Sequence, residues 1–131
     1  MPYYYPRIKF GRAKAPRKEG HIKKSDKWLQ QKYCLFNKRY WSGTLPWIPV
    51  YFRGKPHSTH EGYCYAYSCG SPEGITVNGY NHEKRVMQIL LHEMVHVEQF
   101  HTKKKADHGR YFKSRCRELT ILTKEKYGVI K

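Results

Sequence analysis

The chain has 131 residues, of which 39% are hydrophobic, which is enough for one domain and too few for two independent cores. It carries 26 lysines and arginines against 10 acidic residues, a net charge of +16 that favours a polyanionic partner such as nucleic acid. No apolar run approaches the ~18 residues of a membrane span, and the first residues lack the apolar segment of a secretory signal, so we expect a cytoplasmic protein without a membrane partner.

Residues 1–24 are predicted to form a basic, flexible arm. Prolines and glycines interrupt any helix there, and 8 of the 24 residues are lysine or arginine. Residues 25–131 are then the folded domain. Ser25 has the position of an N-cap, and the apolar pattern after it predicts a first helix over about residues 26–40, which ends before Gly43.

Three short strands are predicted for the middle of the chain. Residues 47–52 are aromatic and β-branched, and Pro49 places them at a sheet edge because proline cannot donate to a ladder. Residues 62–67 alternate with tyrosines on one face, and residues 74–79 end in an Asn-Gly turn. The connections are long enough for antiparallel pairing, and no βαβ alternation appears.

Two helices are predicted to complete an α+β fold with an antiparallel three-stranded sheet. Over residues 83–101 the apolar positions cover most of the helix circumference, which is typical of a central, buried helix. After a lysine-rich loop, Asp107 is expected to cap a last helix that runs to about residue 126 and ends at Gly128. The predicted inward face of this helix contains Phe112, Cys116, Leu119 and Leu122.

The central helix contains Leu91-His92-Glu93-Met94-Val95-His96, an H-E-x-x-H motif. His92 and His96 lie one turn apart, so both imidazoles can bind one ion at ~2.0–2.1 Å. Glu93 is rotated by ~100° from His92, which places its carboxylate beside the metal and outside its coordination shell. From there it can take a proton from metal-activated water and pass it to a leaving amine. The motif predicts one Zn²⁺ ion per chain, with Glu93 as general base.

Three residues compete to be the third metal ligand. His101 lies ~180° from His92 on the same helix and would point away from the metal. Glu118 lies on the following helix and is the alternative. His108 begins that helix and shares an inward face with Phe112 one turn later. We select His108 as the third ligand.

The four cysteines form no C-x-x-C pair. We therefore expect four buried or half-buried thiols and no second metal site. Reduced thiols agree with a cytoplasmic location.

A series of short segments resembles a known protein family over residues 34–118. The segments are, in order, Leu35-Phe36-Asn37, Tyr40-Trp41-Ser42-Gly43-Thr44-Leu45-Pro46, Gly62-Tyr63, Ile75-Thr76-Val77, the H-E-x-x-H motif and His108-Gly109-Arg110-Tyr111-Phe112. Together they are similar to the SprT-like (Spartan-type) zinc metallopeptidases, in which a His-Gly-x-x-Phe signature supplies the third ligand.

This resemblance implies a minimal zincin-like core in which His92, His96 and His108 hold zinc and Glu93 is catalytic. It also implies a protein substrate at or near DNA, because Spartan-type enzymes digest proteins crosslinked to DNA. Many relatives carry a cysteine-rich zinc subdomain after the core, and the printed sequence contains none. We expect the arm and the loop residues Lys103, Lys104 and Lys105 to provide the nucleic-acid contact instead.

Two further features of a carbonyl hydrolase have candidates in the sequence. Tyr111 is the first candidate for an oxyanion stabiliser, followed by Tyr80 and His82. Residues 75–77 are predicted as an edge strand along which an extended peptide can dock by β-addition.

The leading hypothesis is a zinc-dependent endopeptidase that acts on proteins at or near DNA. The alternative is a zinc-stabilised nucleic-acid-binding or regulatory protein without significant proteolytic turnover, and a third is a regulator that cleaves one protein partner. Glu93 favours an enzyme, because a structural zinc site closes with four protein ligands and needs no carboxylate beside it.

Overall fold

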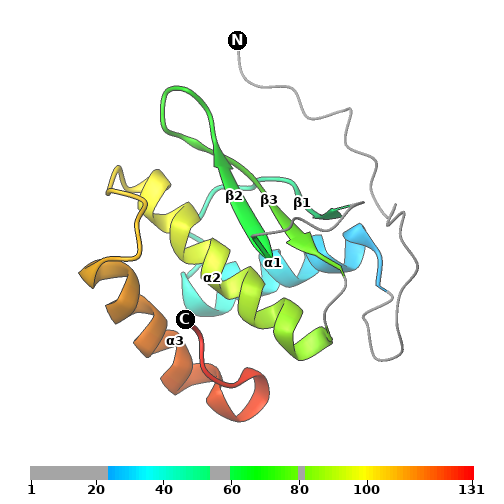
Figure 1. The fold of residues 1–131 in the computed structure, drawn as a ribbon. Helices are drawn as coiled ribbons and strands as arrows, with labels where there is room; N and C mark the ends of the chain where they lie inside the picture. Colours follow the sequence, from blue (N-terminus) through cyan, green and yellow to red (C-terminus); the bar gives the residue numbers. More distant parts are fainter. Residues whose placement is uncertain (1–23, 54–59, 80–81) are drawn as a thin grey trace.

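The computed structural model describes residues 24–53, 60–79 and 82–131 (Figure 1). The predicted arm lies, apart from Lys24, outside these residues. The elements follow in the order α1 (Asp26–Tyr40), β1 (Val50–Arg53), β2 (Gly62–Ala66), β3 (Pro72–Asn78), α2 (Glu83–His101) and α3 (Arg110–Tyr127). Three helices and a three-stranded sheet in the described part of the chain confirm the α+β class.

Helix α1 begins as the sequence predicts. The hydroxyl of Ser25 accepts a hydrogen bond from the backbone N–H of Trp28 at 3.1 Å, which confirms Ser25 as the N-cap. Leu29, Tyr33 and Phe36 are buried, and their spacing of three and four residues turns one face of α1 toward the core.

The sheet is mixed, with the strand order β1-β3-β2. Strand β2 pairs with β3 in the antiparallel direction, but β1 runs parallel to β3. The predicted antiparallel sheet is therefore wrong for β1, although β1 is an edge strand as expected. The predicted strand over residues 47–52 also begins later, at Val50.

Side chains of α1 hold the outer edge of β1 in place. The side-chain amide of Gln30 donates to the carbonyl of Ile48 at 3.0 Å and accepts from the N–H of Val50 at 2.8 Å. A carboxylate oxygen of Asp26 accepts from the N–H of Phe52 at 2.8 Å. These bonds occupy backbone groups that a fourth strand would otherwise use, and they fix the direction in which β1 runs.

Residues 75–77 lie in the central strand, so the prediction that they form an edge is wrong. Ile75 pairs with Val50 of β1 on one side and with Cys64 of β2 on the other. The sheet edge opposite β1 is instead β2.

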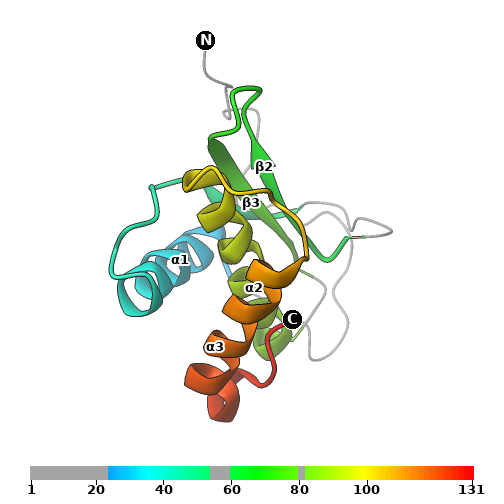
Figure 2. The same ribbon diagram turned by 90° about the vertical axis from the view of Figure 1, so that its left-hand side faces the viewer.

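Helix α2 is the central element of the core. It packs against β2 and β3 on one side and against α3 on the other, while α1 packs against β1. Figures 1 and 2 show α3 beside α2 and away from the strands. The prediction of a buried helix is confirmed by the residues of α2 that are fully inaccessible to solvent: Val86, Met87, Leu90, Leu91, Met94, Val95, Val97 and Gln99.

Helix α3 differs from the prediction at its start and on one face. It begins at Arg110 with Gly109 as N-cap, and Asp107 instead accepts a hydrogen bond from the N–H of Gly109 at 3.0 Å. Leu122 is 61% exposed, so its predicted inward position is wrong. Thr123 is buried in its place, because its hydroxyl donates to the carbonyl of Leu119 at 2.8 Å and needs no other partner.

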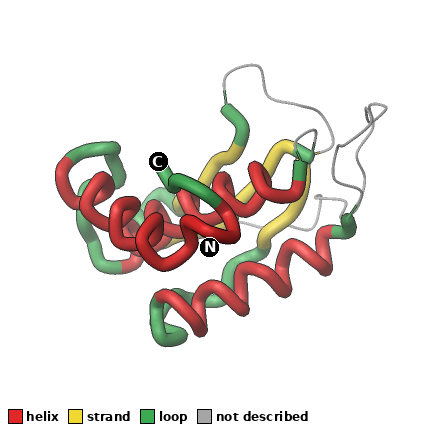
Figure 3. Tube along the Cα trace, turned by 90° about the horizontal axis from the view of Figure 1, so that it is seen from below, coloured by secondary structure: helices red, strands yellow, loops and turns green. Residues whose placement is uncertain are grey.

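The C-terminal segment folds back over the helices (Figure 3). Gly128 ends α3, as predicted, with a φ of 79° that a residue with a side chain rarely adopts. Ile130 is buried, and its N–H donates to the hydroxyl of Thr120 at 2.9 Å. This contact brings the backbone of Lys131 to α2.

A carboxylate on α2 connects the three helices. Glu98 accepts a hydrogen bond from the indole N–H of Trp41 at 2.8 Å and from the guanidinium of Arg115 at 3.2 Å. It also accepts from the hydroxyl of Tyr111. Arg115 in turn donates to the carbonyl of Tyr40 at 2.7 Å. Partly buried charge-assisted bonds of this kind fix the ends of α1, α2 and α3 relative to one another.

The cysteines are thiols, as expected, since none of the four forms a disulfide. Cys64 and Cys116 are buried, whereas Cys34 and Cys69 are exposed, so the expected burial is wrong for those two. No helix in the described residues is both long and apolar enough to cross a bilayer.

Candidate metal centre

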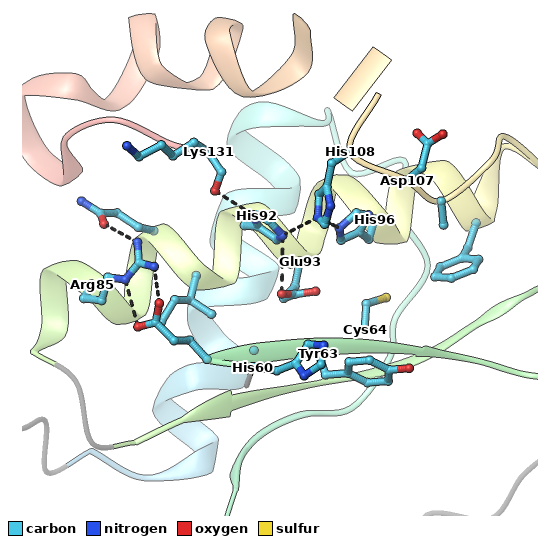
Figure 4. Close-up of a pocket in the computed structure, with 16 residues that line it drawn as sticks. His60, Tyr63, Cys64, Arg85, His92, Glu93, His96, Asp107, His108 and Lys131 are labelled. Carbon is cyan, nitrogen blue, oxygen red and sulfur yellow. Dashed lines mark hydrogen bonds and ion pairs between the residues drawn. The ribbon is translucent and has the colours of Figure 1, made fainter. Parts of the chain in front are cut away.

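Three histidines converge at one point beside α2 (Figure 4). His92 and His96 project from one face of α2, and His108 reaches them from the segment that precedes α3. The Nε2 atom of His108 lies 3.2 Å from that of His96 and 3.3 Å from that of His92. The structure therefore brings together the three residues that were predicted as ligands.

The spacing of these nitrogens fits a tetrahedral metal centre. Two nitrogens bound at ~2.0–2.1 Å to a tetrahedral ion are about 3.3–3.4 Å apart. The two Nε2 separations of 3.2 and 3.3 Å match this spacing, and the ligand atoms of all three histidines lie within 4.8 Å of one another. The three side chains could hold one metal ion and would leave a fourth position for water or substrate.

Hydrogen bonds behind the rings direct the ligand nitrogens inward. The Nδ1 atom of His92 lies 2.7 Å from the backbone carbonyl of Lys131, and that of His96 lies 2.7 Å from the side-chain oxygen of Gln99. Because both partners are acceptors, each Nδ1 carries the hydrogen and each Nε2 presents its lone pair to the centre. Gln99 is fully buried, and its amide donates to the carbonyl of Asp107 at 3.1 Å.

Burial keeps the α2 histidines in the form that binds metals. It lowers the pKa of His92 to about 4 and also lowers the pKa of His96. Both rings are therefore neutral near pH 7, as a metal ligand must be.

Glu93 lies next to the histidines without joining their cluster. The residue is 6% exposed, and its carboxylate comes within 3.9 Å of the Nε2 of His92. Burial raises the pKa of Glu93 to about 8, since the charged form is poorly solvated there. A divalent cation between the histidines would favour the ionised carboxylate, because an opposite charge within ~4–6 Å lowers the pKa of an acid. The residues present thus fit a metal and a base beside it.

The centre opens into a cleft of about 470 Å³, which we call the polar cleft. One wall is β2, and Figure 4 shows Cys64 on the side of this strand that faces Glu93. Tyr63 and His60 also line the cleft. At one end the guanidinium of Arg85 binds the carboxylate of Glu61, which lowers the pKa of Glu61 and joins β2 to α2.

Gly62 allows β2 to lie this close to α2. A Cβ atom on Gly62 would lie 2.4 Å from the Cγ2 of Ile89 and 3.1 Å from a carboxylate oxygen of Glu93. The first distance is far below a van der Waals contact, so only glycine fits without a shift of the backbone.

The two competitors for the third-ligand position lie outside the cluster. His101 is exposed at the C-terminal end of α2. Glu118 is largely exposed and pairs with Arg115 at 3.4 Å. Neither belongs to the histidine cluster, which is completed by His108.

The candidates for an oxyanion stabiliser are not brought to the cleft. The hydroxyl of Tyr111 donates to Glu98, and the residue is not among those lining the polar cleft. His82 is the N-cap of α2 and does not line the cleft either. Tyr80 lies outside the described residues. The role of Tyr111 stays a prediction, and it would require the hydroxyl to leave Glu98.

The predicted nucleic-acid loop, Lys103–Lys105, is exposed and leads directly into the metal centre. The ammonium of Lys104 lies 4.8 Å from the ring centre of Tyr111, and that of Lys105 lies 4.0 Å from Asp107. Ala106 and Asp107, which follow the loop, line the polar cleft. The basic loop and the cleft are thus continuous along the chain.

Sequence reasoning missed the groups that orient the ligands. The position of Gln99, three residues after His96, could have indicated a partner on the same helix face. No sequence pattern could have indicated the carbonyl of Lys131 as the partner of His92, because every residue has the same backbone carbonyl.

The chain was compared with protein-family models, curated proteins and solved structures. Searches of curated proteins and of solved structures gave no match. A model of the SprT-like family matches residues 29–127, which include both helices of the metal centre and all three histidines. The chain therefore belongs to the SprT-like family.

Proposed function

We propose that this protein is a zinc-dependent endopeptidase of SprT-like type that acts on proteins at or near DNA. The observation that carries the proposal is the position of Glu93. It is buried beside the histidine cluster, contributes no ligand to it, and faces a cleft walled by an edge strand. A purely structural metal site would have no use for a carboxylate held at this position.

The chemistry divides between the metal and the chain. Zinc held by His92, His96 and His108 would supply Lewis-acid chemistry, lowering the pKa of water toward neutrality and polarising a peptide carbonyl. Glu93 accepts the proton of the attacking water and delivers it to the leaving amine nitrogen. Gln99 and Lys131 keep the rings of His96 and His92 oriented throughout.

Strand β2 is the surface on which we expect the substrate backbone to dock. It is the sheet edge that lines the polar cleft, and no further strand of the described residues pairs with its outer side. An extended peptide can add to such an edge by backbone hydrogen bonds.

The link to DNA is supported by the basic loop. Lys103, Lys104 and Lys105 are exposed and immediately precede residues that line the cleft. Phosphates bound there would hold a DNA-bound protein near the cleft and raise its effective concentration.

Glu93→Gln tests the catalytic part of the proposal. The amide has almost the same size but cannot accept the proton, so zinc content and thermal stability should stay at wild-type values while cleavage of a protein substrate is lost. The substrate should be supplied both alone and bound to DNA. Equal cleavage by both proteins contradicts the mechanism. Absence of cleavage by either one favours a zinc-stabilised nucleic-acid-binding protein.

Replacing Lys103, Lys104 and Lys105 by alanine tests the DNA part. DNA affinity of the wild-type protein should fall with salt, and the triple variant should reduce the slope by about 2–3, because each contacted phosphate contributes ~0.7–0.9. Zinc content serves as the control. A salt-independent interaction contradicts the DNA link and leaves the peptidase proposal intact.

A further inference from the structure

A second cavity opens on the other side of the histidine cluster from β2. It encloses about 740 Å³, within the range of ligand-binding pockets. Its floor is formed by Phe112, Cys116 and Ile130, all nearly inaccessible to solvent. We call it the apolar pocket, because its lining is made mainly of carbon atoms.

Two rows of side chains on α3 and the C-terminal segment shape this pocket. Phe112, Cys116 and Thr120 follow one another at intervals of four residues and form one row. Ile121 ends the neighbouring row and is 80% exposed. Val129, 50% exposed, forms the wall opposite. Exposed aliphatic side chains on both walls leave apolar surface that an occupant could cover.

The apolar pocket is continuous with the metal centre. His92 and His108 line both the polar cleft and the apolar pocket, and so does Lys131. A peptide bond placed at the cluster along β2 would therefore have one flanking side chain next to the pocket entrance. The apolar pocket is thus close enough to the metal centre to contact a residue next to the cleaved bond.

Positive charge surrounds the pocket. Lys113, Arg117 and Lys131 line it and are exposed, and none of the described lining residues is acidic. The rim therefore complements acidic residues on either side of an apolar side chain.

We propose that the apolar pocket binds a large apolar side chain of the substrate next to the cleaved bond, with a preference for acidic neighbours. The inference rests on the proposed peptidase function and names the class of substrate sequence. Ile121 and Val129 are its specificity-determining residues, and Lys113 and Arg117 select the flanking charge.

Binding of short peptides tests the pocket without the need for turnover. The probes are fluorescein-labelled dodecapeptides with one central leucine flanked by glutamates, the same peptide with a central serine, and the leucine peptide flanked by lysines. Fluorescence anisotropy is measured with the zinc-loaded full chain carrying Glu93→Gln, so that no probe is cleaved. Burial of a leucine side chain predicts at least tenfold weaker binding of the serine peptide.

Two adjacent residues of α3 provide a matched pair of variants. Ile121→Glu introduces a carboxylate at the pocket rim. Leu122→Glu introduces a carboxylate at a neighbouring position that is also exposed but does not line the pocket. Ile121→Glu should weaken the leucine peptide about tenfold, and Leu122→Glu should leave it unchanged. Lys113→Glu with Arg117→Glu should reverse the preference from glutamate-flanked to lysine-flanked peptides. Zinc content and melting temperature confirm that every variant is folded.

Each outcome decides the inference separately from the proposed function. Equal affinity for the leucine and serine peptides, or equal effects of the two α3 variants, overturns the pocket even if the wild-type protein is a peptidase. A concentration-dependent dimer that Ile121→Glu abolishes would also overturn it, since the apolar surface would then be covered by a second copy. Selective binding with no cleavage by the wild type would support the pocket while contradicting the peptidase.

Discussion

Gly62→Ala probes the contact between β2 and α2 on which the polar cleft depends. The added Cβ would lie 2.4 Å from the Cγ2 of Ile89, a branched side chain that is almost fully buried and cannot turn away. It would also lie 3.1 Å from a carboxylate oxygen of Glu93. The strand must therefore move away from the helix, and Glu93 must shift with it.

The expected cost follows from overpacking. One extra methyl group in a packed interior costs about 1–3 kcal/mol of unfolding free energy. For a domain of about 100 residues this corresponds to a fall in melting temperature of about 4–24 °C. Because the three atoms nearest to the added Cβ belong to Ile89 and Glu93 and none belongs to a histidine, zinc content should change little while cleavage falls.

A double-mutant cycle with Ile89→Ala identifies the clash as the cause. Ile89→Ala alone removes buried methyl groups and should cost about 2–5 kcal/mol. In the double variant the alanine at position 62 would occupy part of this space. The loss of unfolding free energy in the double variant should therefore be smaller than the sum of the two single losses by about 0.5–3 kcal/mol. Thermal and urea unfolding measure the free energies. A Gly62→Ala protein within about 0.5 kcal/mol of wild type, or strict additivity, would refute the close approach of the two elements.

Two further predictions concern Gln99 and the thiols. Gln99→Ala removes the acceptor behind His96 and should weaken zinc binding about 10–100-fold in a chelator competition. The control, Gln88→Ala at the other end of α2, should leave zinc affinity unchanged. Equal effects of the two variants on zinc affinity would contradict the assigned tautomer of His96. Hydrogen bonds from Ser71 lower the pKa of exposed Cys69, while burial raises the pKa of Cys116 to about 11. Because the thiolate is the reactive form, alkylation of Cys69 should begin at lower pH than that of Cys116, as followed by mass spectrometry, and simultaneous alkylation would contradict both environments.

The elements that local sequence patterns determine were predictable. The cap at Ser25, the buried character of α2 and the stop at Gly128 all depend on residues close in the chain. The third histidine was also accessible to reasoning, because the helix period excluded His101 and the position of His108 allowed a return to α2. The SprT-like resemblance over residues 34–118 agrees with the family match over residues 29–127.

The direction of β1 and the place of β3 were not predictable from these patterns. The parallel course of β1 is fixed by Asp26 and Gln30 of α1, whose contacts with β1 span more than 15 residues of sequence. The burial of a polar residue on α3 was equally unpredictable: Thr123 is buried, and its hydroxyl donates to the carbonyl of Leu119 within the same helix. The carbonyl of Lys131 reaches His92 only through the fold of the C-terminal segment.

Metal analysis of the purified protein and of its single-histidine variants tests the metal centre most directly. Inductively coupled plasma mass spectrometry should find one zinc per chain in the wild type and in His101→Ala and Glu118→Ala, whose side chains lie outside the cluster. His92→Ala, His96→Ala and His108→Ala should each lose most of the metal, since each removes one of the three ligands. Full zinc content in folded His108→Ala, or its loss in Glu118→Ala, would contradict the centre described for this protein.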